Sequence, residues 1–146
     1  MKVYLDNCCY NRPYDDQSYL KISLETQAKI KIQDIIKNKE IELVSSFMSR
    51  YEADKSPYEL RKTLIKQFIT DNTSQYVPGE IFADKLQADV ETIMATGVKF
   101  KDAVHVACAI YARADYFLST DMRLLKYHTE KIKMVNPIKF IEDMEV

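Results

Sequence analysis

The stretch "KDAVHVACAIYARADYFLSTD", Lys101 to Asp121, joins an apolar helical pattern to a buried strand and has an acidic residue near each end. Small apolar residues fill the stretch 99–114, and their spacing predicts a buried helix there. The following residues, "DYFLST" (115–120), include the aromatic and β-branched types that favour strands. Asp102 therefore lies at the start of a helix, and Asp121 directly follows a strand.

The same alternation continues toward the N-terminus. A short buried strand at 2–5 ends on Asp6, turn-forming residues predict a loop up to residue 16, and a helix is predicted over 17–38. Its expected apolar face is Leu20, Leu24, Ala28, Ile32, Ile35 and Ile36. A strand at 41–46 follows, and Ser45 or Ser46 can cap the helix that comes after it.

The remaining elements are a helix from Pro57, an extended piece at 74–78, a helix between Gly79 and Gly97, a short helix at 121–128, a strand at 131–135 and a helix at 137–144. Strands separated by helices in this way predict an α/β fold, with a mostly parallel sheet between helices on both faces. We expect one domain over residues 1–146, since this is a common domain size.

Composition excludes several classes of protein. Hydrophobic residues make up 47% and charged residues 29% of the chain, as in ordinary folded proteins. The 21 basic and 22 acidic residues nearly cancel, so no global field attracts a polyanion. Three cysteines, two of them adjacent, argue against a disulfide framework, and no apolar run is long enough to span a membrane. We therefore expect a cytoplasmic protein without a membrane partner.

Glycine and histidine are too scarce for several well-known sites. The only two glycines, Gly79 and Gly97, cannot form a dinucleotide fingerprint, a phosphate-binding loop or a nucleophile elbow. His105 and His128 are too far apart for a zinc-protease helix, and the cysteines lack finger spacing. Carboxylates remain as the most plausible chemical groups.

Four acidic residues are expected at one edge of the predicted sheet. Asp6 and Asp121 follow strands, and Asp102 and Glu52 lie early in helices, positions that gather at the carboxyl edge of a parallel sheet. Unit charges at contact repel by about 4 kcal/mol at an effective dielectric of 20, so a cluster of acids needs a counter-charge. Oxygen ligands suit Mg²⁺ or Mn²⁺, which activate water toward phosphodiesters.

A purely structural interpretation exists for three of these acids. Asp102 and Asp121 fit helix caps or first-turn acids, and Ser49 with Glu52 fits the S-x-x-E capping box. Asp6 caps nothing obvious in the predicted order of elements. The convergence of all four on one edge favours a functional site.

Three stretches together resemble the PIN-domain family of metal-dependent nucleases, which includes the ribonuclease toxins of bacterial toxin-antitoxin pairs. These are "VYLDNCCYNRPYDDQ", "SSFMSRYEAD" and "KDAVHVACAIYARADYFLSTD", and their order and spacing match over nearly the whole chain. The resemblance implies a three-layer α/β/α fold with a mostly parallel, roughly five-stranded sheet. It also implies an RNA substrate, a cognate antitoxin protein and a homodimer as partners.

The family's four acids fall on Asp6, Glu52, Asp102 and Asp121, which the resemblance makes both the catalytic residues and the ligands of Mg²⁺ or Mn²⁺. Glu42 and Asp54 lie near Glu52 and are alternatives for the second acid. Ser119 fits the family's polar position before the last acid. Cys8 departs from the pattern, because a thiol replaces the usual hydroxyl or amide and is a poor ligand for a hard ion.

Two other functions stay open at the level of sequence. Cys8 motivates a non-catalytic module of the same fold that binds RNA or protein, and Cys8 or Cys9 could serve a thiol hydrolase. We interpret His105 as a satisfied core residue and leave it out of the catalytic set. Phosphate contacts are possible for Arg12, Lys99 and Lys101.

Overall fold

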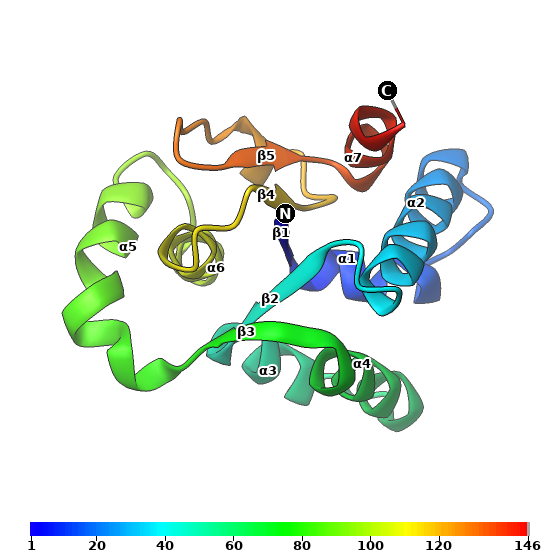
Figure 1. The fold of residues 1–146 in the computed structure, drawn as a ribbon, viewed down its shortest axis with the longest axis horizontal. Helices are drawn as coiled ribbons and strands as arrows, with labels where there is room; N and C mark the ends of the chain where they lie inside the picture. The colour runs from blue at the N-terminus through cyan, green and yellow to red at the C-terminus, as the bar shows by residue number, and fades with distance from the viewer. Residues whose placement is uncertain (146) are drawn as a thin grey trace.

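A five-stranded parallel sheet forms the centre of the computed structural model, which describes residues 1–145 (Figure 1). Its order is β3-β2-β1-β4-β5, so the first strand of the chain lies in the middle. The strands are β1 (Lys2–Leu5), β2 (Glu42–Ser46), β3 (Thr73–Val77), β4 (Tyr116–Leu118) and β5 (Lys133–Val135). All four pairings are parallel, so every strand ends at the same edge of the sheet.

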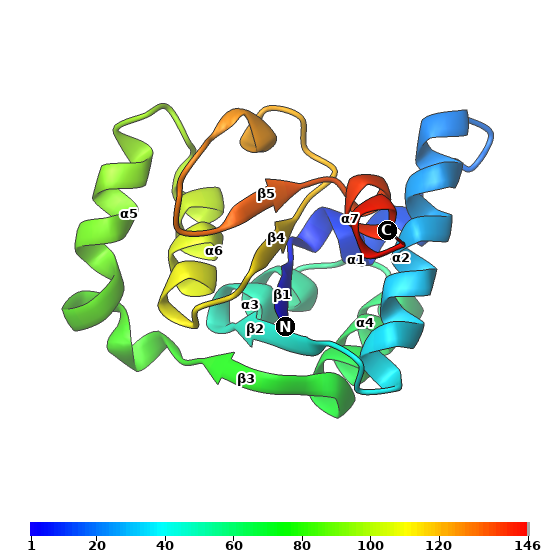
Figure 2. The same ribbon diagram turned by 45° about the horizontal axis from the view of Figure 1, so that its top comes forward.

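Helices cover both faces of the sheet. They are α1 (Asn7–Asn11), α2 (Leu20–Lys37), α3 (Phe47–Asp54), α4 (Glu59–Asn72), α5 (Gln87–Met94), α6 (Phe100–Tyr111) and α7 (Pro137–Met144). In both ribbon views α5 and α6 lie on one side of the strands, and α2, α4 and α7 lie on the other (Figures 1 and 2). The predicted three-layer α/β/α fold is confirmed.

The protein has a hydrophobic core on each face of the sheet, and the central strand β1 contributes side chains to both. Successive side chains of a strand point to opposite faces. Val3 and Leu5 accordingly pack in the core on the side of α2 and α7, and Tyr4 packs in the core on the side of α5 and α6. A strand buried on both faces needs continuous apolar residues, which is why "VYL" shows no polar alternation.

Several predicted elements differ from the structure. The predicted helix between Gly79 and Gly97 is a 3₁₀ turn at Gly79–Ile81, a π-helical segment at Phe82–Leu86 and the helix α5, and the predicted short helix at 121–128 is a 3₁₀ turn at Leu124–Lys126. The segment after Asp6 is the helix α1 instead of a loop, and a 3₁₀ turn at Arg12–Tyr14 follows it. Helix α4 begins at Glu59 and not at Pro57, because the backbone N–H of Tyr58 donates to the Ser56 hydroxyl at 3.3 Å in a local turn. Within residues 1–145, no helix has both the length and the apolar character needed to cross a membrane.

The predicted apolar face of α2 is wrong at its N-terminal end. Leu20 and Leu24 are 74% and 42% exposed, whereas Glu25 and Lys29 are buried. Polar contacts decide this orientation. Glu25 Oε1 accepts a hydrogen bond from Arg12 Nε at 2.9 Å, and its Oε2 accepts one from the Asn136 amide.

The pair formed by Glu25 and Arg12 joins three parts of the chain. Glu25 is fully buried, and a second Arg12 nitrogen lies 2.8 Å from its Oε1, so the carboxylate is neutralised by a two-pronged contact. Arg12 also contacts Asp15 at 2.9 Å. The charge of the guanidinium is therefore neutralised within the fold, which disfavours the phosphate contact that the sequence allowed for Arg12.

Removal of this cation should destabilise the protein strongly. We expect Arg12→Ala to lower the free energy of unfolding by about 3 kcal/mol, because it leaves the Glu25 charge buried without a partner. The double variant Arg12→Ala/Glu25→Gln should recover part of the loss, since the buried group is then neutral. Urea denaturation measures both. Equal stabilities for Arg12→Ala and the parent would contradict the buried pair.

Candidate active site

Five acidic side chains line one cavity at the carboxyl edge of the sheet, and four of them are the predicted site residues. Asp6, Glu52, Asp102 and Asp121 line a cavity of about 330 Å³, together with Asn7, Cys8, Asn11 and Asp15. We call it the acidic cavity. Asp6 follows β1, Glu52 lies in α3 after β2, Asp102 is in the first turn of α6, and Asp121 follows β4. The parallel topology brings these four together, as the sequence predicted for their position.

Asp6 is held by several hydrogen bonds and is nearly buried. Its Oδ1 accepts from the backbone N–H of Asn7 at 2.9 Å, so Asp6 is the N-cap of α1. The expectation that Asp6 caps nothing was wrong, because α1 takes the place of the predicted loop. Its Oδ2 accepts from the Ser119 hydroxyl at 2.9 Å.

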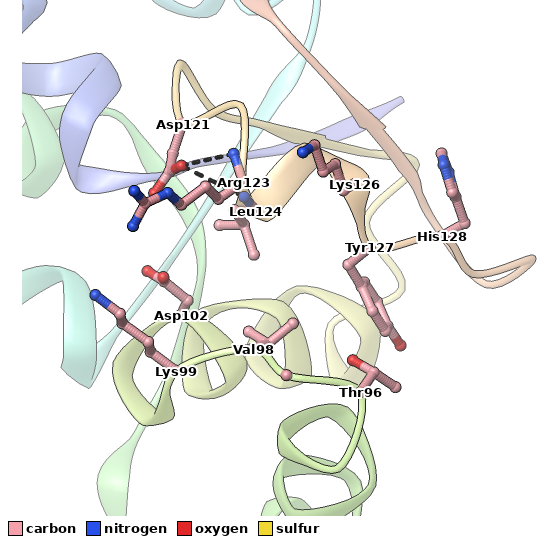
Figure 3. A pocket seen from close by; sticks show the side chains of 11 residues that line it. Thr96, Val98, Lys99, Asp102, Asp121, Arg123, Leu124, Lys126, Tyr127 and His128 are labelled. Atoms are coloured by element: carbon pink, nitrogen blue, oxygen red, sulfur yellow. Dashed lines mark hydrogen bonds between the residues drawn. The ribbon is translucent and has the colours of Figure 1, made fainter.

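One hydroxyl connects two of the acids. Ser119 is fully buried; its Oγ donates to Asp6 Oδ2 and accepts from the backbone N–H of Asp121 at 3.0 Å. Asp121 Oδ1 in turn accepts from the N–H groups of Arg123 at 2.9 Å and Leu124 at 3.4 Å (Figure 3). Asp121 thus caps the following turn and lines the cavity at the same time.

Cys8 belongs to this network. Its thiol donates to Asp6 Oδ2 at 3.3 Å, and its sulfur accepts from the backbone N–H of Thr120 at the same distance. A thiolate nucleophile needs an electropositive surrounding, and Cys8 faces a carboxylate instead. Cys9 is buried, and burial raises the pKa of its thiol well above the ordinary value. Both observations disfavour the thiol hydrolase.

A buried polar chain positions Glu52. The Nε2–H of His105 donates to Glu52 Oε1, and His105 Nδ1 lies 2.5 Å from the Tyr4 hydroxyl. That hydroxyl is 2.7 Å from Ser46 Oγ and 3.2 Å from Ser49 Oγ. The capping box of α3 is formed by Ser46 and Ser49, so the predicted pairing of Ser49 with Glu52 was wrong.

His105 is the site residue that sequence reasoning left out. It is fully buried, and its Nε2 lies 3.8 Å from Asp6 Oδ1 as well as beside Glu52. Burial lowers the pKa of His105, but the hydrogen bond to Glu52 and the charges of Asp6 and Asp102 outweigh it and raise the pKa above its ordinary value. The available signal was its position three residues after Asp102 on the same helix.

The acidic cavity carries more negative charge than the protein neutralises. Burial, followed by the charges of Asp6 and Asp121, raises the pKa of Asp102 to about 6. Clustered carboxylate oxygens are the donors that hard divalent cations prefer, so Asp6, Glu52, Asp102 and Asp121 could hold Mg²⁺ or Mn²⁺. In the part of the chain that the structure describes, no three His, Cys, Asp or Glu side chains stand in a metal-binding arrangement.

Comparisons with solved structures identify the fold. Over 93% of its length the chain is similar to a chain of VapBC2 from Rickettsia felis bound to a DNA fragment from its promoter, with a TM-score of 0.57, 13% identity and 98% of that chain covered. A chain of FitAB bound to the IR36 DNA fragment matches the same 93% share with a TM-score of 0.58, 14% identity and 95% of that chain covered.

The matched chains are PIN-domain proteins, and this protein has the PIN-domain fold. The resemblance that the sequence motifs indicated is thereby confirmed for the fold. No family model matches the chain, and no curated protein matches it either.

The burial of Asp102, together with the charges of Asp6 and Asp121, predicts the pH dependence of stability. The raised pKa of Asp102 means that the metal-free folded protein binds this proton more tightly than the unfolded chain does. Its contribution to stability is full below about pH 4 and is lost as the pH rises through about 6. Asp102→Asn should remove this dependence and stabilise the metal-free protein at pH 7 by about 1 kcal/mol, a figure reduced for the half-exposed side chain.

Thermal unfolding in EDTA between pH 4 and 8 tests this, with the exposed Asp84→Asn as the matched control. A variant at position 102 that is less stable than the parent at pH 7 would show that burial and the neighbouring charges do not destabilise the ionised Asp102.

The polar chain behind Glu52 should contribute to stability. Tyr4→Phe leaves the ring in place but removes the hydroxyl shared by His105 and the two serines, and we expect a loss of about 1–3 kcal/mol for the unpaired buried groups. Urea denaturation measures the loss. Tyr19→Phe, at a side chain that is 63% exposed, is the control and should change little. Equal losses in the free energy of unfolding for the two variants would argue against a stabilising role of the polar side chains behind Glu52.

Proposed function

We propose that this protein is a Mg²⁺- or Mn²⁺-dependent endoribonuclease of the PIN-domain class. The observation that carries the proposal is the convergence of Asp6, Glu52, Asp102 and Asp121 on one cavity, together with the raised pKa of Asp102. A cation bound among these acids would offset their mutual repulsion. The fold supports the same class.

The acids would divide the work according to their contacts. Asp6, Asp102 and Asp121 would supply the carboxylate oxygens of the metal site, and Ser119 fixes Asp6 through its Oδ2. The ion, when bound, supplies positive charge that lowers the pKa of a water molecule and stabilises the phosphodiester during attack. His105 occupies Glu52 Oε1, which leaves Glu52 Oε2 to bind or to accept a proton from the attacking water.

We further propose that the protein is the toxin of a toxin-antitoxin pair acting in the cytoplasm. The support is the similarity over 93% of the chain to chains from two toxin-antitoxin complexes. A cognate antitoxin is the partner that this proposal requires. A homodimer remains a prediction from the resemblance.

A second candidate is a binding module that has the fold without the activity. Two observations favour it: Cys8 occupies a position where the family uses a better ligand for hard ions, and Glu52 is turned toward His105. In this case RNA or a protein partner would bind, and the acids would hold a metal weakly or not at all.

Cleavage of a mixed panel of fluorescent RNAs in Mn²⁺ tests the nuclease. We expect cutting that EDTA abolishes and that Asp6→Asn lowers about a hundredfold or more, since the variant loses a metal ligand. Asp84→Asn, a substitution of the same kind on an exposed acid outside the cavity, should cut like the parent. Calorimetric titration with Mn²⁺ should show binding that Asp102→Asn weakens.

The two candidates give different results. Asp6→Asn protein that binds Mn²⁺ and cuts RNA like the parent would contradict the nuclease assignment. A folded parent that binds RNA in EDTA but neither binds Mn²⁺ nor cuts would identify the binding module.

A further inference from the structure

Two cavities lined by cations adjoin the acidic cavity. One has a volume of about 470 Å³, shares Asp102 and Asp121 with the acidic cavity and is also lined by Lys99, Arg123 and Lys126. We call it the Arg123 cavity. The other has a volume of about 280 Å³, shares Asn7, Asn11 and Glu52 and is also lined by Lys55, Arg61 and Lys101. We call it the Arg61 cavity. The two cavities have no residue in common, so each adjoins the acidic cavity through a different part of its lining.

The Lys and Arg side chains that line these two cavities form no salt bridge with a carboxylate among the described residues. Among residues 1–145, the salt bridges of Lys and Arg involve Arg12, Lys31, Lys66 and Lys139, and none involves a cation of the Arg123 or Arg61 cavity. Three Lys or Arg side chains on each side are therefore not neutralised by a carboxylate and can bind phosphates, although Lys55 and Lys101 also lie over the ring of Tyr51. Such contacts release counterions and supply most of the affinity for a nucleic-acid strand.

The Arg61 cavity contains a guanidinium that is already held in place. Arg61 lies over the rings of Tyr58 at 4.4 Å and Tyr14 at 4.8 Å, measured to the ring centroids. Its Nε is buried without a hydrogen-bond partner. Tyr58 is 60% exposed, so its ring can also stack on an unpaired base. Both features suit a single strand, since the bases of a duplex are stacked on one another.

The Arg123 cavity combines charge near the acids with an aromatic ring farther away. Figure 3 shows the side chains of Lys99 and Arg123 close to Asp102 and Asp121, and Tyr127 at the opposite end of the cavity beside Thr96. Cations next to the acids offset their repulsion of a phosphate. The ring of Tyr127 offers a surface for one base.

We propose that single-stranded RNA crosses the acidic cavity with nucleotides bound in the Arg123 cavity on one side and in the Arg61 cavity on the other. This inference rests on the proposed function. It also explains which phosphodiester bond of the RNA strand is cleaved. A strand held on both sides places an internal phosphodiester over the acids, so the enzyme cuts within a strand and not at its end.

Binding without cleavage tests the two sides separately. Fluorescence anisotropy of labelled single-stranded RNA in EDTA is measured for the parent, for Arg123→Ala/Lys126→Ala and for Lys55→Ala/Lys101→Ala. Each double variant should bind about 3–10-fold more weakly and reduce the slope of log K against log salt by about 1–2. The control Lys21→Ala/Lys85→Ala removes two exposed lysines outside both cavities and should bind like the parent.

Several results would overturn the proposal. These are unchanged binding in either double variant of the two cavities, a loss as large in the control, or equally tight binding of duplex RNA of the same sequence. Circular dichroism of each variant shows whether it is folded.

A cleavage experiment in Mn²⁺ separates this inference from the proposed function. RNAs shortened from one end should be cut more slowly once one of the two cavities is empty. If the parent cuts RNA but neither double variant changes cutting or binding, the nuclease stands and the two-sided path is wrong. If both double variants weaken binding while the parent cuts nothing, the path stands and the nuclease fails.

Discussion

The parallel pairing of β1 with a strand on each side is the constraint on which the rest of the structure depends. Tyr4 lies opposite Val44 of β2 and Phe117 of β4, so three strands reach the same edge at nearly the same level. Whatever follows them must share a small volume. In this chain carboxylates follow, and the backbone N–H of Asp6 is fixed to the carbonyl of Leu118 at 2.9 Å. The acidic cavity is therefore a product of strand register, and the side chains only complete it.

Much of this arrangement could be predicted because it depends on the order of elements and not on detailed packing. The helix at Phe100–Tyr111 and the strand at Tyr116–Leu118 lie inside the ranges that the apolar patterns indicated. Their acids then follow from topology alone. The segment after Asp6 was not predictable in the same way. Its Asn and Pro residues indicate a turn, yet Cys9 and Tyr10 are buried in the core, and this burial favours a helix over a loop.

The polar interior is the part that local sequence could not provide. Tyr4 and His105 are 101 positions apart, and each is flanked by apolar residues that indicate core. Glu25 is a similar case, because helical periodicity assigns it to the exposed side of α2. In the structure it is buried, and it accepts hydrogen bonds from Arg12, which precedes α2, and from Asn136, which follows β5. Burial of such groups depends on partners that meet only in the folded state. The sequence pattern of a single helix or strand cannot indicate which residues these partners are.

The contact between Asp6 and the Ser119 hydroxyl has a consequence for the order of events in folding. The two residues are 113 positions apart, so this part of the site cannot form until the chain has folded back on itself across most of its length. Contacts between such distant residues are slow to form, because a long loop must close first. A chain that has been synthesised only as far as the end of α5 contains Asp6 and Glu52 but neither Asp102 nor Asp121. Any activity that needs all four acids is therefore absent until the chain extends past Asp121 and the site has folded.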